Sequence, residues 1–481
     1  MSISSTLSNA LSGMSAASRM AEVVSSNVSN SLTDGYGRRT LNLSAAVIGG
    51  HGAGVEIGSI TRHVDRGILS DRRLADASLG EYGALVSTVN RIQDVMGIAG
   101  NQGSISSRIV ALESALVDAA SDPSSEIRLT SLFDRLEGVA NGLNQASRDI
   151  QSERVRADKS ISNQIDRLNT ALAQVEQLNS DITYSRNTGI DPSGLMDQRQ
   201  RAIDTIAEIV PVRELDRDGG QVALMTPDGE SLIDGKAKVF GFSHTPVITS
   251  DMTLHSSGLF GITLDGAQIA SDGIGKLVGG TLGAAFAARD IEFVSAQAGL
   301  DIVAADLITR FQDPSVDQTI LAGQPGFFTD AGTAFASADT SGLAARISVN
   351  SLINPDTGGS VSKLRDGLNA TSLGLSGNAN LLLSLSAAVS SPQMIGTDMT
   401  QQSAAGRAAS FESEIGSRRL MFEAEMSFAS ARWASLKEAE TADGVNTDYE
   451  MQTLLRVEQA YAANARVVQT VESLMQRLME I

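Results

Sequence analysis

The sequence contains no cysteine in 481 residues, which excludes disulfides, thiolate metal sites and cysteine nucleophiles. Histidine is almost as scarce: His51, His63, His244 and His255 are scattered, and none stands in an HExxH pattern. No serine lies in a G-x-S-x-G motif, and no glycine-rich stretch completes a phosphate-binding loop. We therefore expect no catalytic residue, no cofactor and no metal, and we predict that the chain is not an enzyme.

Positive charge is also in deficit. The chain has 37 Lys and Arg against 56 Asp and Glu, a net charge of −19, and no stretch concentrates basic residues enough to bind a phosphate backbone. The longest apolar stretch, near 381–389, is far shorter than the ~20 residues of a membrane span. The amino terminus lacks the basic opening and apolar run of a cleaved signal peptide. We expect no nucleic-acid partner, no membrane partner, and a soluble chain or one that leaves the cell without such a signal.

The two ends of the chain carry heptad patterns instead. Apolar residues of the first thirty positions are spaced by alternating steps of four and three, and the large ones are Ile3, Leu7, Met14, Val24 and Val28. The last thirty positions repeat this spacing, with Asn464 as the one polar member, through Leu454, Val457, Tyr461, Val468, Val471, Met475 and Leu478. The pattern predicts that both termini form one α-helical coiled coil, and we refer to these twelve apolar residues as the assembly seam.

Long helical periods also fill much of the body, above all from 124 to 186, and these are typical of rod-like elements. Between 212 and 275 the apolar period changes to two, and Asp-Gly pairs separate the short runs, which predicts β-hairpins. The predicted fold is mainly α with an inserted β domain, elongated and nested, so that the chain runs out and returns. The expected domains are a terminal coiled coil (1–50 with 441–481), a long-helix bundle (51–211 with 276–440, irregular over 315–400) and an all-β insert (212–275).

A heptad stripe on one helix is more often an ordinary buried face than an assembly surface. Here both stripes lie at the chain ends, where segments are usually frayed. Burying one large seam residue is worth roughly 1.5–3 kcal/mol, and the two helices have only twelve of them. Ordering costs about 1.5 kcal/mol for every one of their roughly sixty residues. An isolated pair of such helices is therefore expected to be marginal, and to be completed by helices of neighbouring copies.

One segment after the first helix carries a family resemblance. The stretch NSLTDGYGRRT at 30–40 resembles the segment that follows the first helix in the axial proteins of the bacterial flagellum. Asp34 stands where that family usually has proline, which an Asp-Gly turn can replace. The matching family-motif residues here, with the Gly-Val-Asn before the last helix, are Asn27, Asn30, Thr33, Gly35, Tyr36, Gly444, Val445 and Asn446.

Two longer stretches, 194–235 and 443–478, are similar to the hook-associated members of that family, and Leu195, Asp197, Gln198 and Arg199 are among the matches. The resemblance implies a structural subunit that joins hook to filament after flagellar type III export. It also implies a closed ring of about eleven copies, located in the extracellular flagellum. The implied partners are the hook protein on one side, the second hook-associated protein or filament on the other, and a cytoplasmic export chaperone at the carboxyl-terminal helix.

Three alternatives stay open at this point. The chain could be another axial component, such as hook, rod or second hook-associated protein, because the Gly-Val-Asn motif is shared among them. A cytoplasmic coiled-coil scaffold would also show long heptads, but it would remain in the cell. An enzyme carried in the β insert is the third, and it would require a polar cleft with convergent side chains.

Overall fold

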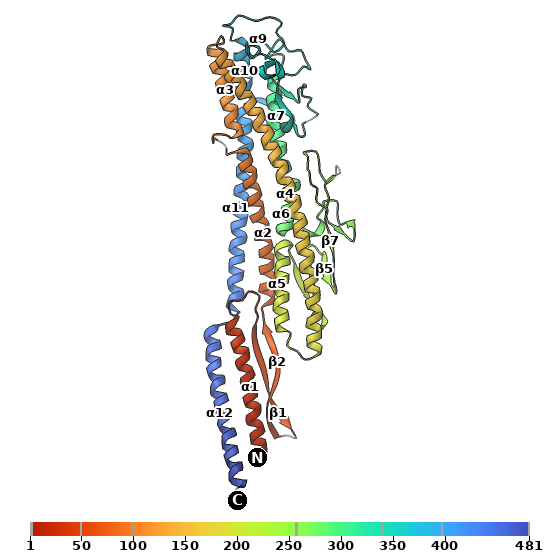
Figure 1. Ribbon diagram of the computed structural model, residues 1–481, viewed down its shortest axis with the longest axis vertical. Helices are drawn as coiled ribbons and strands as arrows, with labels where there is room; N and C mark the ends of the chain where they lie inside the picture. Colours follow the sequence, from red (N-terminus) through yellow and green to blue (C-terminus); the bar gives the residue numbers. More distant parts are fainter. Residues whose placement is uncertain are drawn as a thin grey trace.

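A computed structural model describes residues 3–48, 51–98, 100–254, 258–338, 340–395 and 398–479. The molecule is elongated and mostly helical, with short antiparallel strands, as the sequence predicts (Figure 1). Both chain ends lie at the same end of the molecule. The chain therefore runs to the far end and returns.

The helices differ widely in length, and the longest is 62 residues. Their bounds are α1 (Ile3–Ser29), α2 (Arg66–Met96), α3 (Ile105–Ser121), α4 (Glu126–Asn187), α5 (Ser193–Ile209), α6 (Gly280–Ala287), α7 (Phe293–Phe311), α8 (Leu343–Arg346), α9 (Lys363–Asp366), α10 (Asn380–Ser390), α11 (Ala404–Ala442) and α12 (Thr447–Met479). A π-helical turn, Ala288–Glu292, joins α6 to α7.

The terminal region consists of α1, α12 and a hairpin. Helix α1 lies beside α12 with the opposite direction, and it also contacts the hairpin of β1 (Arg38–Ile48) and β2 (His51–His63) (Figure 1). The antiparallel pairing of β1 with β2 runs from Arg38 opposite His63 to the turn. This pairing extends to His63, beyond the domain boundary expected at residue 50, and the division into domains stays a prediction.

The bundle is built on α4, which at about 1.5 Å per residue is roughly 90 Å long. Ser125 caps its start by accepting from the backbone N–H of Arg128. Its predicted stripe is fully covered by neighbouring elements, through Ile161, Ile165, Leu168, Leu172, Val175, Leu178 and Ile182. This stripe is thus an ordinary helix face that is buried inside one chain.

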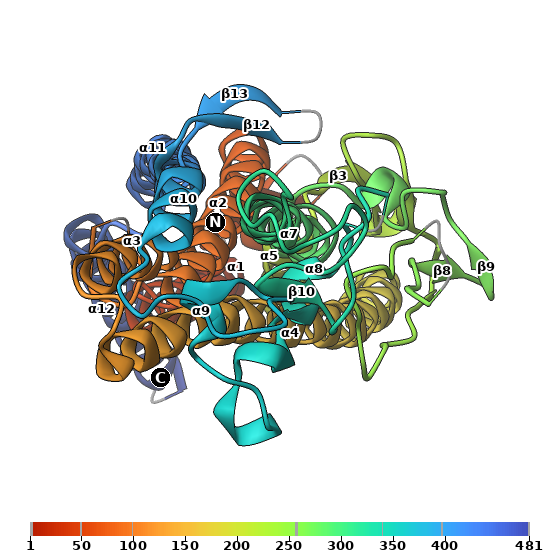
Figure 2. The same ribbon diagram turned by 90° about the horizontal axis from the view of Figure 1, so that it is seen from above.

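Strands follow α5, where the period-two pattern predicts them. One sheet has the order β3-β4-β5-β6 and a second has β7-β8-β9, both antiparallel. Their bounds are β3 (Arg213–Asp216), β4 (Val222–Met225), β5 (Ser231–Asp234), β6 (Lys236–Ala237), β7 (Phe240–Gly241), β8 (Thr263–Leu264) and β9 (Ala267–Gln268). Asp265 and Gly266 both have positive φ in the β8–β9 turn, as a tight hairpin requires. Viewed from above, β8 and β9 lie on the opposite side of the molecule from α11 (Figure 2).

The stretch 315–400, expected to be irregular, consists of short elements around the far end of the bundle. The stretch ARISVNSLI at 345–353 predicts a local hairpin, and this prediction is wrong. The strand β11 (Ile347–Val349) pairs instead with the distant β10 (Phe328–Asp330). A further hairpin of β12 (Gln393–Ile395) and β13 (Asp398–Gln402) precedes α11 and was not predicted.

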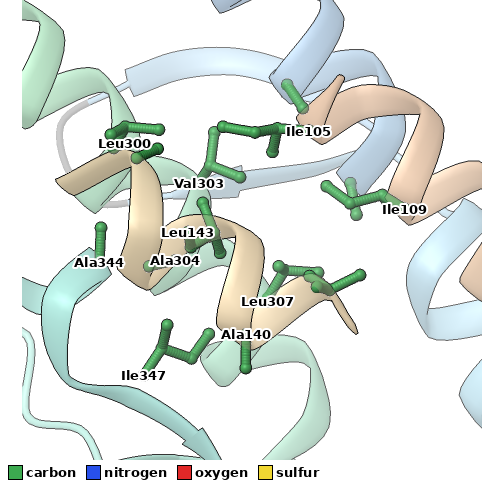
Figure 3. Packing of buried hydrophobic residues seen from close by; sticks show 14 of the residues in the cluster. Ile105, Ile109, Ala140, Leu143, Leu300, Val303, Ala304, Leu307, Ala344 and Ile347 are labelled. Atoms are coloured by element: carbon green, nitrogen blue, oxygen red, sulfur yellow. The ribbon is translucent and has the colours of Figure 1, made fainter. Parts of the chain in front are cut away.

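The main core lies where α3, α4 and α7 meet the short elements at the far end. Figure 3 shows side chains from four elements packed together: Ile109 from α3, Leu143 from α4, Leu307 from α7 and Ile347 from β11. A second cluster joins the carboxyl half of α4 to α5, α6 and the inserted sheets. Among the residues that the structure describes, neither core includes a residue of α1 or α12.

Candidate functional site: the terminal helix pair and its joint

The assembly seam is only partly covered within one chain. On α1, Val24 is buried, Leu7, Met14 and Val28 are half-buried, and Ile3 is exposed. On α12 the buried seam residues are Val457 and Val471, whereas Leu454 and Val468 are half-buried. The remaining three are exposed: Tyr461 by 44%, Met475 by 45% and Leu478 by 61%.

The contact between the two helices uses small residues at its centre. A Cβ atom at Gly13 would lie 2.8 Å from Asn464 Nδ2, so a larger residue here would require the Asn464 side chain to move. The amide of Asn464 donates to the carbonyl of Ala460 in its own helix at 2.9 Å. The polar member of the stripe is therefore packed against α1, and its register role stays a prediction.

The family-motif residues near residue 30 form the elbow between α1 and the hairpin. Asn27, which is 1% exposed, donates to the carbonyl of Arg39 at 2.8 Å and accepts from the Arg39 N–H at 3.0 Å. The Tyr36 hydroxyl donates to the same amide oxygen at 2.9 Å, and the Arg39 guanidinium lies over the Tyr36 ring. Burial raises the pKa of Tyr36, against the hydrogen bond to Ser26 and the charge of Arg39. The elbow is thus held by a buried amide that satisfies both backbone groups of one residue.

The other motif residues shape the two turns of this region. The Asn30 amide donates to the Ser26 carbonyl at 2.9 Å, and Thr33 donates to the Asn30 side chain at 3.3 Å. Gly35 has φ +76°, a conformation that favours glycine. Gly444 and Val445 connect α11 to α12, and Asn446 caps α12 by accepting from the backbone N–H of Tyr449 at 3.0 Å.

Asp197 of α5 connects the elbow to the bundle. One carboxylate oxygen accepts from Arg62 Nε at 2.7 Å and from the Gly37 N–H at 3.1 Å, and the other accepts from Arg39 at 2.6 Å. The Asp197 side chain is only 6% exposed, so these charges lie in a largely desolvated site. Asp34, in the usual place of proline, accepts from Lys437 of α11 at 3.3 Å and adds an exposed link across the same joint.

A second ionic group lies directly behind the first. Arg72 of α2 lies 2.7 Å from Asp204 of α5 and 2.9 Å from Glu440 of α11, and it also pairs with Asp76. Arg73 pairs with Asp204 and, in β3, with Glu214, both at 2.7 Å. We call these residues, with Asp197 and its partners, the ionic joint. It ties the hairpin, α2, α5, β3 and the end of α11 together.

Comparisons with known proteins bear on the whole chain. Residues 89–328, about half of it, match the family model of the flagellar hook-associated protein FlgK helical domain. Residues 7–36 match the flagella basal body rod protein model, and 441–481 match the flagellar basal body rod FlgEFG protein C-terminal model. The chain is 25% identical over 242 residues to flagellar hook-associated protein 1 of Escherichia coli (strain K12), and 23% identical over 240 residues to that of Bacillus subtilis (strain 168).

The chain belongs to the flagellar hook-associated protein 1 family. The matched stretches cover 48% and 47% of this chain but only 44% and 47% of these two relatives, so the chain spans about half of their length. The structure of the flagellar hook junction protein FlgK from Burkholderia pseudomallei shares the fold, with a TM-score of 0.58 and 13% identity over 77% of this chain and 99% of that chain.

The family models and curated relatives named above are those of flagellar hook-associated and basal body rod proteins. No helix in the described residues is both long and apolar enough to cross a membrane. Within the same residues, no three His, Asp or Glu side chains gather as a metal site would require.

Sequence reasoning found the motif residues of the elbow but missed the partners that bind them. Asp197 and Arg199 were noted only as family matches, yet both are buried on α5. Two opposite charges on the covered face of a helix that otherwise buries Ile203 and Ile206 were the available signal. A buried charge requires a partner, but the sequence does not say from which element it comes.

Proposed function

We propose that the chain is a structural subunit of the bacterial flagellum that joins hook to filament as hook-associated protein 1, after flagellar type III export. The paired termini then form an α-helical coiled coil that neighbouring copies complete, in a ring of about eleven copies closed by a repeated interface. The proposed neighbours are the hook protein on one side and the second hook-associated protein or filament on the other. Before export, a cytoplasmic chaperone covers the carboxyl-terminal helix.

The observation that carries the proposal is the apolar surface of α12. In 33 residues this helix buries only Glu450, Val457 and Val471. Large apolar side chains that are at least 39% exposed recur along it: Tyr449, Met451, Leu455, Tyr461, Val467, Leu474, Met475, Leu478 and Met479. Exposed apolar side chains that recur along one helix favour an interaction surface, and burying each such side chain is worth roughly 1.5–3 kcal/mol.

The division into domains supports the same arrangement. We propose a terminal domain of 1–63 with 441–481, a long-helix bundle and a β insert over 212–275. The described residues of the terminal domain contribute to neither core cluster, whereas the bundle and insert each contribute to one. A domain that folds fully only against sister copies suits a subunit that is exported first and assembled later.

Deletion of the gene tests the assignment. We expect cells that build hooks but no filaments and lose flagellin to the medium, with wild-type motility restored by the intact gene. Loss of the hooks themselves would point to a rod or hook subunit, which the family models at both ends of the chain keep as the second candidate. Normal filaments would contradict both, and a chain retained in the cytoplasm would favour a scaffold.

A further inference from the structure

A cleft of about 440 Å³ lies beside the ionic joint, between the end of β2, helix α5, the last turn of α4 and the loop after β3. Arginine dominates its lining, although the chain as a whole carries a charge of −19. The six arginines are Arg62, Arg66, Arg73, Arg186, Arg199 and Arg217. Three carboxylates also line it, from Glu214, Asp216 and Asp218. A second hollow of about 560 Å³ continues from it along the hairpin and shares three of these arginines.

Four of the six arginines have carboxylate partners. Arg62 pairs with Asp197, Arg66 with Asp216, Arg73 with Asp204 and Glu214, and Arg217 with Asp234. Asp197 is already shared, because Arg39 binds its other oxygen. Among the described residues, no carboxylate lies within ion-pair distance of the remaining two, Arg186 and Arg199. The carboxylate of Asp218, which also lines the cleft, can balance only one of these two positive charges.

Arg199 is the stronger indication, because its side chain is buried with no carboxylate in direct contact. It is 8% exposed, and its Nη1 donates to Asn179 Oδ1 at 2.9 Å and to the Gly220 carbonyl at 2.7 Å, both neutral acceptors. Burial lowers the pKa of Arg199 to about 10 against the attraction of the more distant Glu214, and repulsion from Arg62 and Arg186 adds to the lowering. Arg73, which is 2% exposed, has in addition a buried Nη2 that makes no hydrogen bond. A buried cation without a counterion is costly unless an anion joins it.

Arg186 is held at the mouth of the cleft. A Cβ atom at Gly220 would lie 2.6 Å from Arg186 Cζ, so this glycine lets the guanidinium rest against the turn. A basic residue in the last turn of a helix also complements the helix dipole, which accounts for an arginine at the end of α4. That explanation does not extend to Arg199, which lies in the middle of α5.

We infer that this cleft is a binding site for an oxyanion, a phosphate, sulfate or carboxylate group held between Arg186 and Arg199 with Arg73 behind them. Guanidinium groups match the planar and tetrahedral arrangement of such oxygens and bind them by paired, charge-assisted hydrogen bonds. The bound anion neutralises the unpaired charges between α4, α5 and the hairpin. It thereby stabilises the joint on which the terminal helices depend.

Titration of the full-length monomer with inorganic phosphate tests the inference, by calorimetry at constant ionic strength set with chloride. We expect saturable binding by the wild-type chain and an affinity about tenfold lower for Arg186→Gln, because one charge-assisted contact is lost. Arg156→Gln is the matched control, since Arg156 is an exposed arginine of α4 that pairs with Glu153 outside the cleft. Absence of saturable binding by the wild type, or equal affinity in Arg186→Gln, would overturn the inference.

The source of the anion is distinguished in the same preparations by sedimentation at high protein concentration. If a carboxylate of a second copy fills the cleft, phosphate and Arg186→Gln should both weaken self-association, and Arg156→Gln should not. If the natural ligand is a free anion, self-association should be unchanged by phosphate while phosphate binding persists. Arg199→Gln, checked for an unchanged circular dichroism spectrum, provides the second variant. None of these outcomes depends on the flagellar assignment.

Discussion

Replacement of Asp197 by alanine is the sharpest test of the ionic joint. This carboxylate accepts from Arg39, Arg62 and the Gly37 N–H, and thereby connects the hairpin to α5. Asp197→Ala leaves both guanidinium groups without an anionic partner and the Gly37 N–H without its acceptor, and Arg62 keeps only the neutral acceptors of Gly35 and Gln200. The groups cannot recover full hydration, because the side chains of Arg39 and Arg62 are only 17% and 14% exposed.

The expected cost follows from this geometry. Removing one member of a buried ion pair typically costs about 3–5 kcal/mol, most of it from the charge left behind. The loss should appear as local opening of the elbow and hairpin, because the bundle core does not contain these residues. An opening free energy lowered by this amount accelerates amide exchange by about two to four powers of ten.

Hydrogen exchange followed by mass spectrometry measures this locally. We expect faster exchange over 38–63 and unchanged protection in the middle of α4, which lies inside the core. Asp234→Ala is the matched control, because Asp234 binds Arg217 through both oxygens at 3.0 Å but both side chains are exposed. If Asp197→Ala alters exchange of the hairpin no more than Asp234→Ala does, the joint is not what holds the hairpin.

Three further outcomes are expected. Gly280→Ala should reduce the melting temperature, because φ is +64° and a Cβ would lie 2.3 Å from a backbone oxygen. Gly283→Ala is the control in the same helix: its Cβ would meet no atom closer than 3.6 Å, so it should be neutral or stabilising by about 1 kcal/mol. Val471→Ala should destabilise the buried contact of α12 with α1 by about 1–3 kcal/mol in exchange measurements, whereas Met475→Glu should leave the monomer unchanged and abolish filament assembly in cells. Burial raises the pKa of the Asp76 carboxyl, against the charge of Arg72. The protonated carboxyl therefore stabilises the folded state at low pH, and this stabilisation is lost as the pH rises through the folded pKa. In denaturant titrations, the stability of Asp76→Asn should therefore rise relative to that of the wild type as the pH increases from acid to neutral.

Periodicity predicted much of the fold because helices and strands differ in repeat. The seven-residue spacing of the stripe through Ile161 and Ile182 placed α4 to within about two residues at each end. Asp-Gly pairs located turns of the insert, since both residues tolerate positive φ. The same periodicity could not show which stripes are covered within one chain. The α4 stripe is buried, whereas Met475 and Leu478 of the equally regular α12 stripe are exposed.

The ionic joint was beyond reach of the sequence for a different reason. Asp197 meets Arg39 and Arg62 across more than 130 positions of chain, and Arg72 meets Glu440 across a still larger separation. Charged residues are common on any helical protein, and no local pattern marks the few that are buried. The strand β10 shows the same limit, because its partner β11 lies beyond an intervening loop and not in a local hairpin.

The joint and the seam are physically coupled, because α12 has little else to fix its direction. Residues 443–446 connect it to α11, and α1 is its main packing partner. Its two buried apolar residues are Val457 and Val471. The position of α1 is in turn set by Asn27 and Tyr36 in the elbow and by Asp197 behind it. A change at Asp197 should therefore misdirect the exposed stripe of α12 without altering any residue of that stripe. Assembly would then fail at the joint, far from the surface that makes the contact.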